Sequence, residues 1–203
     1  MARTELKANP SAEILTLADA KRWLKVTFNE NDELIGSLIP VARRAVELLT
    51  GRAIGSQQYY HFRDCFPGRA TIELEKPPLI TVDTVEYIDP TTGTWATLSS
   101  AAYSTSKSSP ARIRLNEGYS WPTTKKVLDA VRITYTVGYL TQVGVSAGSI
   151  NEGHLPDELL TAMKLMLAHI YSNPQPYTSG SMFKVDEVPL TIHLLTGPYR
   201  VFT

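Results

Sequence analysis

Residues 31–50, NDELIGSLIPVARRAVELLT, followed by Gly51, decide the fold that this sequence predicts. Apolar residues recur here every three or four positions, the spacing that places them on one side of a helix. That side consists of Leu34, Ile35, Leu38, Ile39, Ala42, Ala45, Val46 and Leu49. Asn31 and the acidic residues beside it favour a helix start, and Gly51 readily takes the left-handed conformation that ends a helix. The stretch predicts one long amphipathic helix whose apolar side needs a cover.

Pro40 lies inside this predicted helix. It has no N–H to donate and its ring crowds the carbonyl of Gly36, which costs about 3 kcal/mol in a straight helix. Pro40 falls on the polar side, so a bend there curves the helix around whatever its apolar side covers. We therefore predict one kinked helix rather than two helices.

The length is sufficient for one well-buried domain or one domain with an elaboration, and the basic and acidic residues balance. The 203 residues include 20 basic and 20 acidic ones, so the formal net charge is zero and only a local patch could serve nucleic acid. The single cysteine, Cys65, excludes an intrachain disulfide, and we interpret it as a half-buried strand residue. No secretory signal or membrane-spanning run is apparent, which favours a soluble cytosolic protein without a membrane partner.

The first residues, 1–14, lack apolar periodicity and are expected to form a flexible N-terminal arm. A short helix is predicted from Thr16, because Thr16 and Asp19 have the spacing of a capping box. Trp23 is expected in the core, where it would pack this helix on the helix over residues 31–50. The short link between the two helices makes them neighbours in space.

Extended segments follow Gly51, separated by turn residues such as Asp89, Pro90 and Gly93. The predicted strands are Gln57–Phe62, Ala70–Leu74, Ile80–Ile88, Thr94–Leu98, Ala102–Ser106, Arg112–Leu115 and Ala130–Gly138. The last is the clearest, because apolar and polar residues alternate along it as in a sheet with one wet face. Close spacing of short strands favours a compact antiparallel sheet or a small barrel-like sandwich.

A second long helix is predicted over Pro156–Ser172, after a Gly- and Ser-rich loop at 141–154. Its back carries small or apolar residues and a single basic one, Lys164. Because a solvated helix normally carries more charge, we expect Leu165 and Ala168 to lie against a neighbouring subunit. Residues 173–181 are expected to form a flexible loop, and Pro189–Leu195 a final short helix.

A search for catalytic patterns finds no phosphate-binding loop, dinucleotide motif or nucleophile elbow. The four histidines are far apart and lack metal-binding spacing. The sequence therefore predicts no enzyme, no cofactor and no metal site, and favours a structural or interaction protein.

Basic residues concentrate in the predicted β region, close to Tyr119 and Trp121. They are Arg112, Arg114, Lys125, Lys126 and Arg132. A DNA-facing surface uses such a mixture of cations and aromatic rings. A solvated sheet face above ordinary aromatic residues has the same composition, so both interpretations stay open.

Several short motifs occur in order along the chain. They are Leu15–Val26, the helix end Leu49-Thr50-Gly51-Arg52, Pro77-Pro78-Leu79, Ser120-Trp121-Pro122, Val131–Tyr135 with Gly138-Tyr139, and Pro198-Tyr199-Arg200. In this order they resemble the head–tail connector (adaptor) proteins of tailed bacteriophages, the gp6-like and gp8-like families that also occur in prophages and gene transfer agents. Two parts depart from the resemblance: the loop at 141–153 is longer than usual, and residues 173–187 match no pattern of the family.

The resemblance implies an α+β fold: a helical bundle, formed by an N-terminal helix pair and C-terminal helices, with an inserted antiparallel β-rich region. On this chain the bundle takes residues 15–55 and 155–203, and the insertion takes residues 56–140. It also implies a homo-oligomeric ring, usually of twelve copies, under the portal protein in the virion neck, assembled in the cytoplasm of the bacterial host. Such a ring extends the channel for packaged DNA and offers a platform for a stopper or tail-completion protein.

Candidate contact residues follow from this implied role. Subunit or partner contacts are expected at Arg43, Arg44, Glu47, Leu165, Ala168, Tyr199 and Arg200. A channel-lining or basic surface is expected at Arg112, Arg114, Lys125 and Lys126. Residues 1–14, 173–187 and 199–203 are expected to become ordered on meeting partners. The alternatives are a tail-completion or stopper ring protein, and a nucleic-acid-binding module that uses the basic residues.

Overall fold

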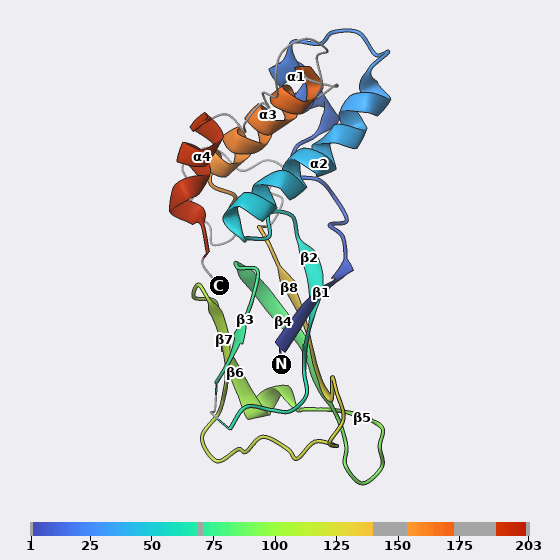
Figure 1. Ribbon diagram of the computed structural model, residues 1–203, viewed down its shortest axis with the longest axis vertical. Helices are drawn as coiled ribbons and strands as arrows, with labels where there is room; N and C mark the ends of the chain where they lie inside the picture. Colours follow the sequence, from blue (N-terminus) through green and yellow to red (C-terminus); the bar gives the residue numbers. More distant parts are fainter. Residues whose placement is uncertain (1, 69–70, 140–153, 173–189, 202–203) are drawn as a thin grey trace, which may run out of the picture. The chain divides into compact units, whose positions relative to one another are not determined.

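A computed structural model describes residues 2–68, 71–139, 154–172 and 190–201 of the chain. The fold is α+β, and contacts divide it into two compact units (Figure 1). The β unit takes the described residues of Met1–Ser11 and Gly55–Leu140. The helical unit takes those of Ala12–Ile54 and Thr141–Phe202. The chain therefore passes from the β unit to the helical unit twice and returns once between them.

The helical unit is built around one central helix, α3, which contacts the three other α-helices that the structure describes. Its elements are α1 (Leu17–Leu24), α2 (Asp32–Thr50), α3 (Asp157–Ser172), α4 (Leu190–Thr196) and the 3₁₀ turn η2 (Gly197–Tyr199). Figure 1 shows α2 and α4 flanking α3. The core of this unit lies where the buried sides of these helices meet.

Helix α2 confirms the prediction of a single helix that continues through Pro40. Asn31 precedes its first turn, and Gly51 ends it with a φ of 71° while its N–H donates to the Glu47 carbonyl. The core side is narrower than the apolar pattern suggests. Its buried apolar residues are Ile35, Ile39, Ala42 and Val46, whereas Leu34 is half exposed.

Helix α1 begins as predicted, because the Thr16 hydroxyl accepts from the Asp19 N–H and donates to the Asp19 carboxylate. The expectation that Trp23 lies in the core is wrong. Its side chain is 42% exposed, with the Lys164 ammonium 5.6 Å from the ring centroid. Over its eight residues α1 buries only Ala20, so the short helix presents too narrow a core side to include Trp23.

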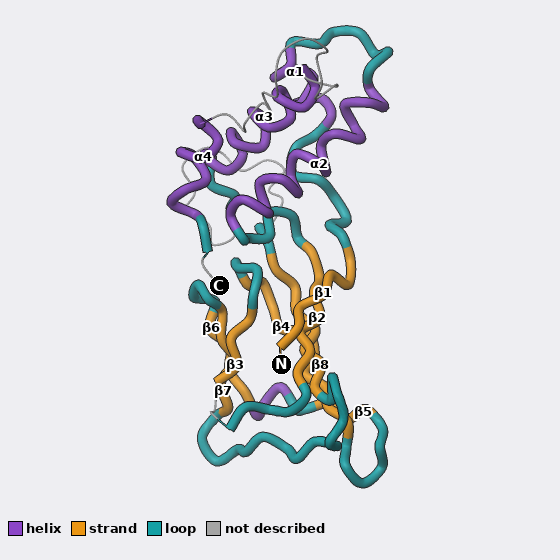
Figure 2. The backbone as a smooth tube through the Cα atoms, viewed as in Figure 1, coloured by secondary structure: helices purple, strands orange, loops and turns teal. Residues whose placement is uncertain are grey.

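The β unit contains two antiparallel sheets (Figure 2). The first has the order β1 (Ala2–Ala8), β2 (Gln57–Arg63), β8 (Val131–Val137), β4 (Leu79–Ile88) and β5 (Trp95–Thr97). The second has the order β3 (Thr71–Leu74), β7 (Ala111–Leu115) and β6 (Tyr103–Ser106), with the 3₁₀ turn η1 (Ser100–Ala102) before β6. The predicted strands are all found, and β4 and β5 form an antiparallel hairpin.

The N-terminal residues correct the expectation of a flexible arm over residues 1–14. Ala2–Ala8 form β1, an edge strand paired along β2. Thr4 lies opposite His61, and the Arg3 guanidinium stacks over Phe62 and pairs with Asp129. Edge strands are often polar and charged, because this discourages pairing with other chains. That composition is the reason why the strand shows no apolar periodicity in the sequence.

Strand β8 forms the centre of the first sheet, between β2 and β4. Its alternation is as predicted, with Ile133 and Tyr135 fully buried, although Thr134 on the other side is also buried. Gly138 follows the strand with a φ of 110°, and a Cβ there would lie 2.0 Å from the Gly55 carbonyl oxygen. Only glycine fits this position. The predicted half-buried strand residue Cys65 is instead exposed, in the turn after β2.

Two predicted segments lie outside the described residues: the loop at 141–153 and the segment 173–187. The same holds for Met1 and for residues 202–203.

Candidate interaction surfaces

A buried charge cluster occupies the C-terminal half of α2. The Arg43 guanidinium pairs with Glu13 at 2.9 Å and with Glu47 at 3.0 Å. Arg43 is 5% exposed and Glu47 4%. Burial lowers the pKa of Arg43, but its hydrogen bond with Glu13 and the charges of Glu47 and Glu13 outweigh burial and raise the pKa. The guanidinium is therefore charged and compensated inside the unit.

Glu47 also holds the end of the helical segment that leads to the β unit. One of its carboxylate oxygens accepts from the Ile54 N–H at 2.9 Å, and the other accepts from Arg44 at 3.4 Å. Glu13 lies just after the chain enters the helical unit, and Ile54 lies just before it leaves. The cluster therefore fastens both of these segments to α2.

This geometry corrects the expectation that Arg43 and Glu47 face outward as subunit contacts. Both are buried in the helical unit, and their charges are paired within it. Only Arg44 of the three remains at the surface, with its side chain half exposed. The sequence could not indicate this burial, because Glu13, which pairs with Arg43, comes from a segment with no recognisable pattern.

The C-terminal residues are bonded to the helical unit as far as Val201. The Tyr199 hydroxyl donates to Glu158 at 3.0 Å, and its carbonyl accepts from Arg52 at 2.6 Å. The Val201 N–H donates to the Thr50 carbonyl at 2.8 Å. The expectation that residues 199–203 become ordered only with a partner is therefore wrong for 199–201. Arg200 is exposed, and on α3 both Leu165 and Ala168 are partly buried.

Helix α2 also presents a row of exposed apolar residues. The apolar pattern had placed Leu34 on the core side of the helix and did not include Val41 and Leu48. Leu34, Val41 and Leu48 are 50%, 49% and 71% exposed. Their seven-residue spacing places them on one side of the helix, away from Ile39 and Val46. We call these three residues the α2 outer row. The spacing was visible in the sequence, but it merged there with the wider apolar pattern.

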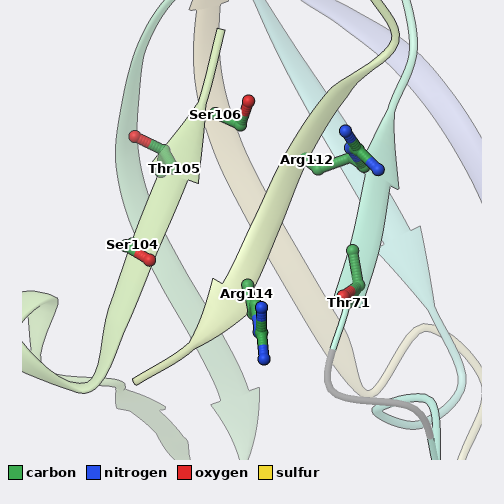
Figure 3. Close-up of a pocket in the computed structure, with 6 residues that line it drawn as sticks. All are labelled: Thr71, Ser104, Thr105, Ser106, Arg112 and Arg114. Atoms are coloured by element: carbon green, nitrogen blue, oxygen red, sulfur yellow. The ribbon is translucent and has the colours of Figure 1, made fainter. Parts of the chain in front are cut away.

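In the β unit, polar residues surround a hollow of about 300 Å³ on the smaller sheet. Figure 3 shows its lining residues: Arg112 and Arg114 on β7, Ser104, Thr105 and Ser106 on β6, and Thr71 on β3. The strand register explains their arrangement. Arg114 lies between Ser104 and Thr71, and Arg112 lies between Ser106 and Glu73. We call this surface the β7 arginine surface.

The side chains of the two arginines have no hydrogen bond or ion pair with any described residue, although their backbones pair with β3 and β6. Arg132 on β8 differs, because it pairs with Glu86 at 3.1 Å and lies over the Trp95 ring. A guanidinium presents several donors in a fixed geometry, so Arg112 and Arg114 together with the neighbouring hydroxyls can hold a phosphate or carboxylate group.

The predicted basic surface is divided in the structure. Lys125 and Lys126 lie in the segment between β7 and β8, and both are exposed. The Lys125 N–H donates to the Ile88 carbonyl, and its ammonium lies beside Gly93, so Lys125 lies against the turn between β4 and β5. The structure therefore brings together Arg112 and Arg114, but shows no contact between them and Lys125.

The aromatic residues of the same segment have different roles. Trp121 stacks on Phe66 with ring centroids 4.6 Å apart and planes inclined by 9°, which makes it a packing residue. Tyr119 is half exposed. Only Tyr119 is therefore accessible for stacking on a base.

The described residues contain no group of three or more His, Cys, Asp or Glu side chains arranged to hold a metal ion. None of their helices has the length and hydropathy needed to cross a membrane.

Comparison with known families finds a match over residues 14–111, to the model of the phage gp6-like head-tail connector protein. A search of curated protein sequences finds no match. The matched residues run from the start of the helical unit to the first residue of β7.

Solved structures with the same fold come from particles of a gene transfer agent. A chain in the neck of an empty particle, computed with C6 symmetry, matches with a TM-score of 0.75 and 18% identity, covering 99% of this chain and 96% of that one. A chain of the native virion matches with a TM-score of 0.75 and 17% identity, covering 98% and 96%. A chain in the neck of the native particle, computed with C12 symmetry, matches with a TM-score of 0.71 and 18% identity, covering 99% and 96%.

Proposed function

We propose that this chain is a structural adaptor that forms a ring in the neck of a tailed phage or gene transfer agent, because residues 14–111 match the model of the phage gp6-like head-tail connector protein. The fold supports this proposal over nearly its whole length, since similar chains occur in the necks of gene transfer agent particles. The role needs no catalytic group. It needs stable units and surfaces that repeat around an axis.

The proposed ring contains twelve copies, bound beneath the portal protein and assembled in the host cytoplasm. The C12 symmetry of one similar neck supports this copy number. A closed ring is built from heterologous contacts, in which each copy uses two different surfaces. The opposite end of the ring would offer the platform for a stopper or tail-completion protein, and packaged DNA would pass through its channel.

Negative-stain imaging and mass measurement of the purified chain, with and without its cognate portal protein, test this proposal. We expect rings of a single copy number when the portal is present. A monomer in isolation is compatible with assembly on the portal. No ring under any condition, together with no association with the portal, would contradict the proposal. Rings that bind the tail tube without the portal would favour the alternative, a tail-completion or stopper protein.

The back of α3 is a proposed subunit contact within this ring. Leu165 and Ala168 are only partly buried by their own unit. We expect Leu165→Glu to block ring assembly while the monomer stays folded, because a carboxylate cannot enter an apolar contact without cost. Leu160→Glu, at another partly buried leucine of α3, is the matched control for an effect on folding alone. Arg44, Tyr199 and Arg200 remain proposed partner contacts.

A second proposed function is contact with the phosphate backbone of DNA through the β7 arginine surface. The absence of protein partners for both guanidinium groups among the described residues favours it. Each phosphate contact adds about 0.9 to the slope of log affinity against log salt, so the affinity should fall steeply as salt rises. Charge reversal at Arg112, Arg114 and Lys125, one at a time, shows by the loss of DNA affinity whether DNA contacts the β7 arginine surface alone or Lys125 as well. A salt-independent affinity, or no loss on reversal, would contradict a DNA contact.

A further inference from the structure

Besides Trp23 and Phe28, the exposed large apolar residues described in the helical unit form two groups on two helices. The first is the α2 outer row, Leu34, Val41 and Leu48. The second is on α4, where Leu190 and Leu194 are 74% and 69% exposed. We call this pair the α4 outer pair.

Both groups point away from the core of their own unit. On α4 the residue between the two leucines, Ile192, is fully buried, and a residue two positions away lies on the other side of a helix. On α2 the buried residues Ile39 and Val46 lie on the side opposite the outer row. The two groups lie on two different helices, α2 and α4, which flank α3 (Figure 1).

These two surfaces match what a ring subunit requires. Heterologous assembly needs one surface on each copy that fits a different surface on the next copy. Residues repeating at positions i, i+7 and i+14 form a straight row along a helix, and such a row packs against another helix. Leucines four positions apart lie on one side of α4 and can enter the spaces between successive residues of the row.

We infer that the α2 outer row of one copy packs against the α4 outer pair of the next copy. This inference rests on the proposed ring and names the surfaces that close it. The partner that covers each of the two groups is a second copy of this chain. Similar chains lie in necks computed with sixfold and twelvefold symmetry, in which the same surfaces recur around the axis. Water is excluded from both surfaces only when neighbouring copies meet.

Cross-linking between two single-cysteine variants tests the contact directly. Cys65 is exposed, so Cys65→Ser is introduced into both variants first. One variant then carries Leu48→Cys and the other carries Leu194→Cys. Because the two cysteines are on different chains, an oxidised product can only report a contact between copies. We expect a disulfide-linked dimer when the variants are mixed under assembling conditions, and only a minor product from either variant alone.

The matched control pairs Leu194→Cys with Leu128→Cys. Leu128 is 82% exposed but belongs to the β unit, so its cysteine is equally accessible without being part of the proposed contact. Little product is expected from this pair. Thermal unfolding of each variant, followed by circular dichroism, verifies that all of them fold.

Charge substitutions provide the second measurement. Leu48→Glu should lower the assembled fraction about tenfold or more, because it buries a carboxylate in an apolar contact. Adding Leu194→Lys should restore part of the loss by pairing the two charges. Leu128→Glu should leave assembly unchanged.

Failure of this inference is distinguishable from failure of the proposed function. If rings form but the Leu48 and Leu194 cysteines do not cross-link, and Leu48→Glu assembles normally, the inference is overturned and the ring stands. Loss of portal binding by Leu48→Glu with normal ring formation also overturns it, since the portal would then cover the α2 outer row. If the unaltered chain forms no ring even with the portal, both proposals are overturned.

Discussion

The two units treat buried ionisable groups in opposite ways. The helical unit buries a charged guanidinium, Arg43, and compensates it with Glu13 and Glu47. The β unit buries an imidazole, His61, and keeps it neutral, because burial and the charge of Arg63 lower its pKa to about 4. Its arginines on β7 stay at the surface without protein partners among the described residues.

This difference separates residues that hold the fold from residues available to partners. A buried charge that has all its partners cannot serve an interface unless the cluster is first broken. Breaking it costs more free energy than most surface contacts contribute. The β7 arginines, whose side chains have no partner among the described residues, carry no such cost. Residue type alone therefore does not identify an interface in this chain, whereas the pairing of each charge does.

The largest effect is expected from Glu47→Ala. It leaves Arg43 with a single counter-charge and the Ile54 N–H without its acceptor. Breaking a buried ion pair by removing one partner costs about 3–5 kcal/mol. Chemical unfolding of the full chain should show this loss, and hydrogen exchange should place it in α2.

Arg44→Ala is the control for this substitution. Arg44 also pairs with Glu47, but its side chain is half exposed, so the change in the free energy of unfolding should stay below about 1 kcal/mol. Equal losses for the two substitutions would mean that burial does not distinguish the residues of the cluster.

The next effect is a loss of stability at acid pH that comes from His61. The pKa is 6.5 in the unfolded chain and about 4 in the folded one, so the unfolded state binds the proton first as the pH falls. The contribution of His61 to stability is complete above pH 6.5, falls between pH 6.5 and pH 4, and amounts to about 3 kcal/mol.

His61→Gln removes the titrating group while keeping a polar side chain that can bond to Thr4. Its free energy of unfolding should therefore vary less between pH 7 and pH 4 than that of the parent chain. Denaturant titrations at several pH values measure both curves. Parallel curves over this range would contradict a buried neutral imidazole.

The smallest effect on stability is expected at the β7 arginines. Arg112→Ser and Arg114→Ser should each change the free energy of unfolding by less than about 0.5 kcal/mol, because neither side chain has a partner among the residues that the structure describes. The double variant should at the same time reduce the salt dependence of DNA binding by about 2 in slope. A large loss of stability would mean that these arginines hold the sheet rather than a ligand.

Sequence patterns predicted the regular elements well wherever the periodicity was local. The Thr16 cap, the extent of α2 and the alternation of β8 all follow from residues within a few positions of one another. The family resemblance was likewise confirmed by the match over residues 14–111.

The sequence could not predict contacts that depend on distant partners. Arg43 is buried because Glu13 lies beside it, and β1 forms because β2 offers a free edge more than fifty residues later. The same limit applies to the candidate surfaces. Periodicity placed Glu47 outside and Leu34 inside, and the structure reverses both, because the real core side of α2 is centred between Ile39 and Val46.

The placement of the β unit within the chain also has a consequence for synthesis. Helix α2 ends at Thr50 and α3, which covers it, begins only at Asp157. About a hundred residues are translated in between, which takes about 5–20 seconds at bacterial rates. Throughout this interval the nascent chain carries the apolar side of α2 without its main cover, while the β unit has all its strands once Val137 has emerged. The length of the insertion thus sets how long the apolar side of α2 stays without its main cover during synthesis.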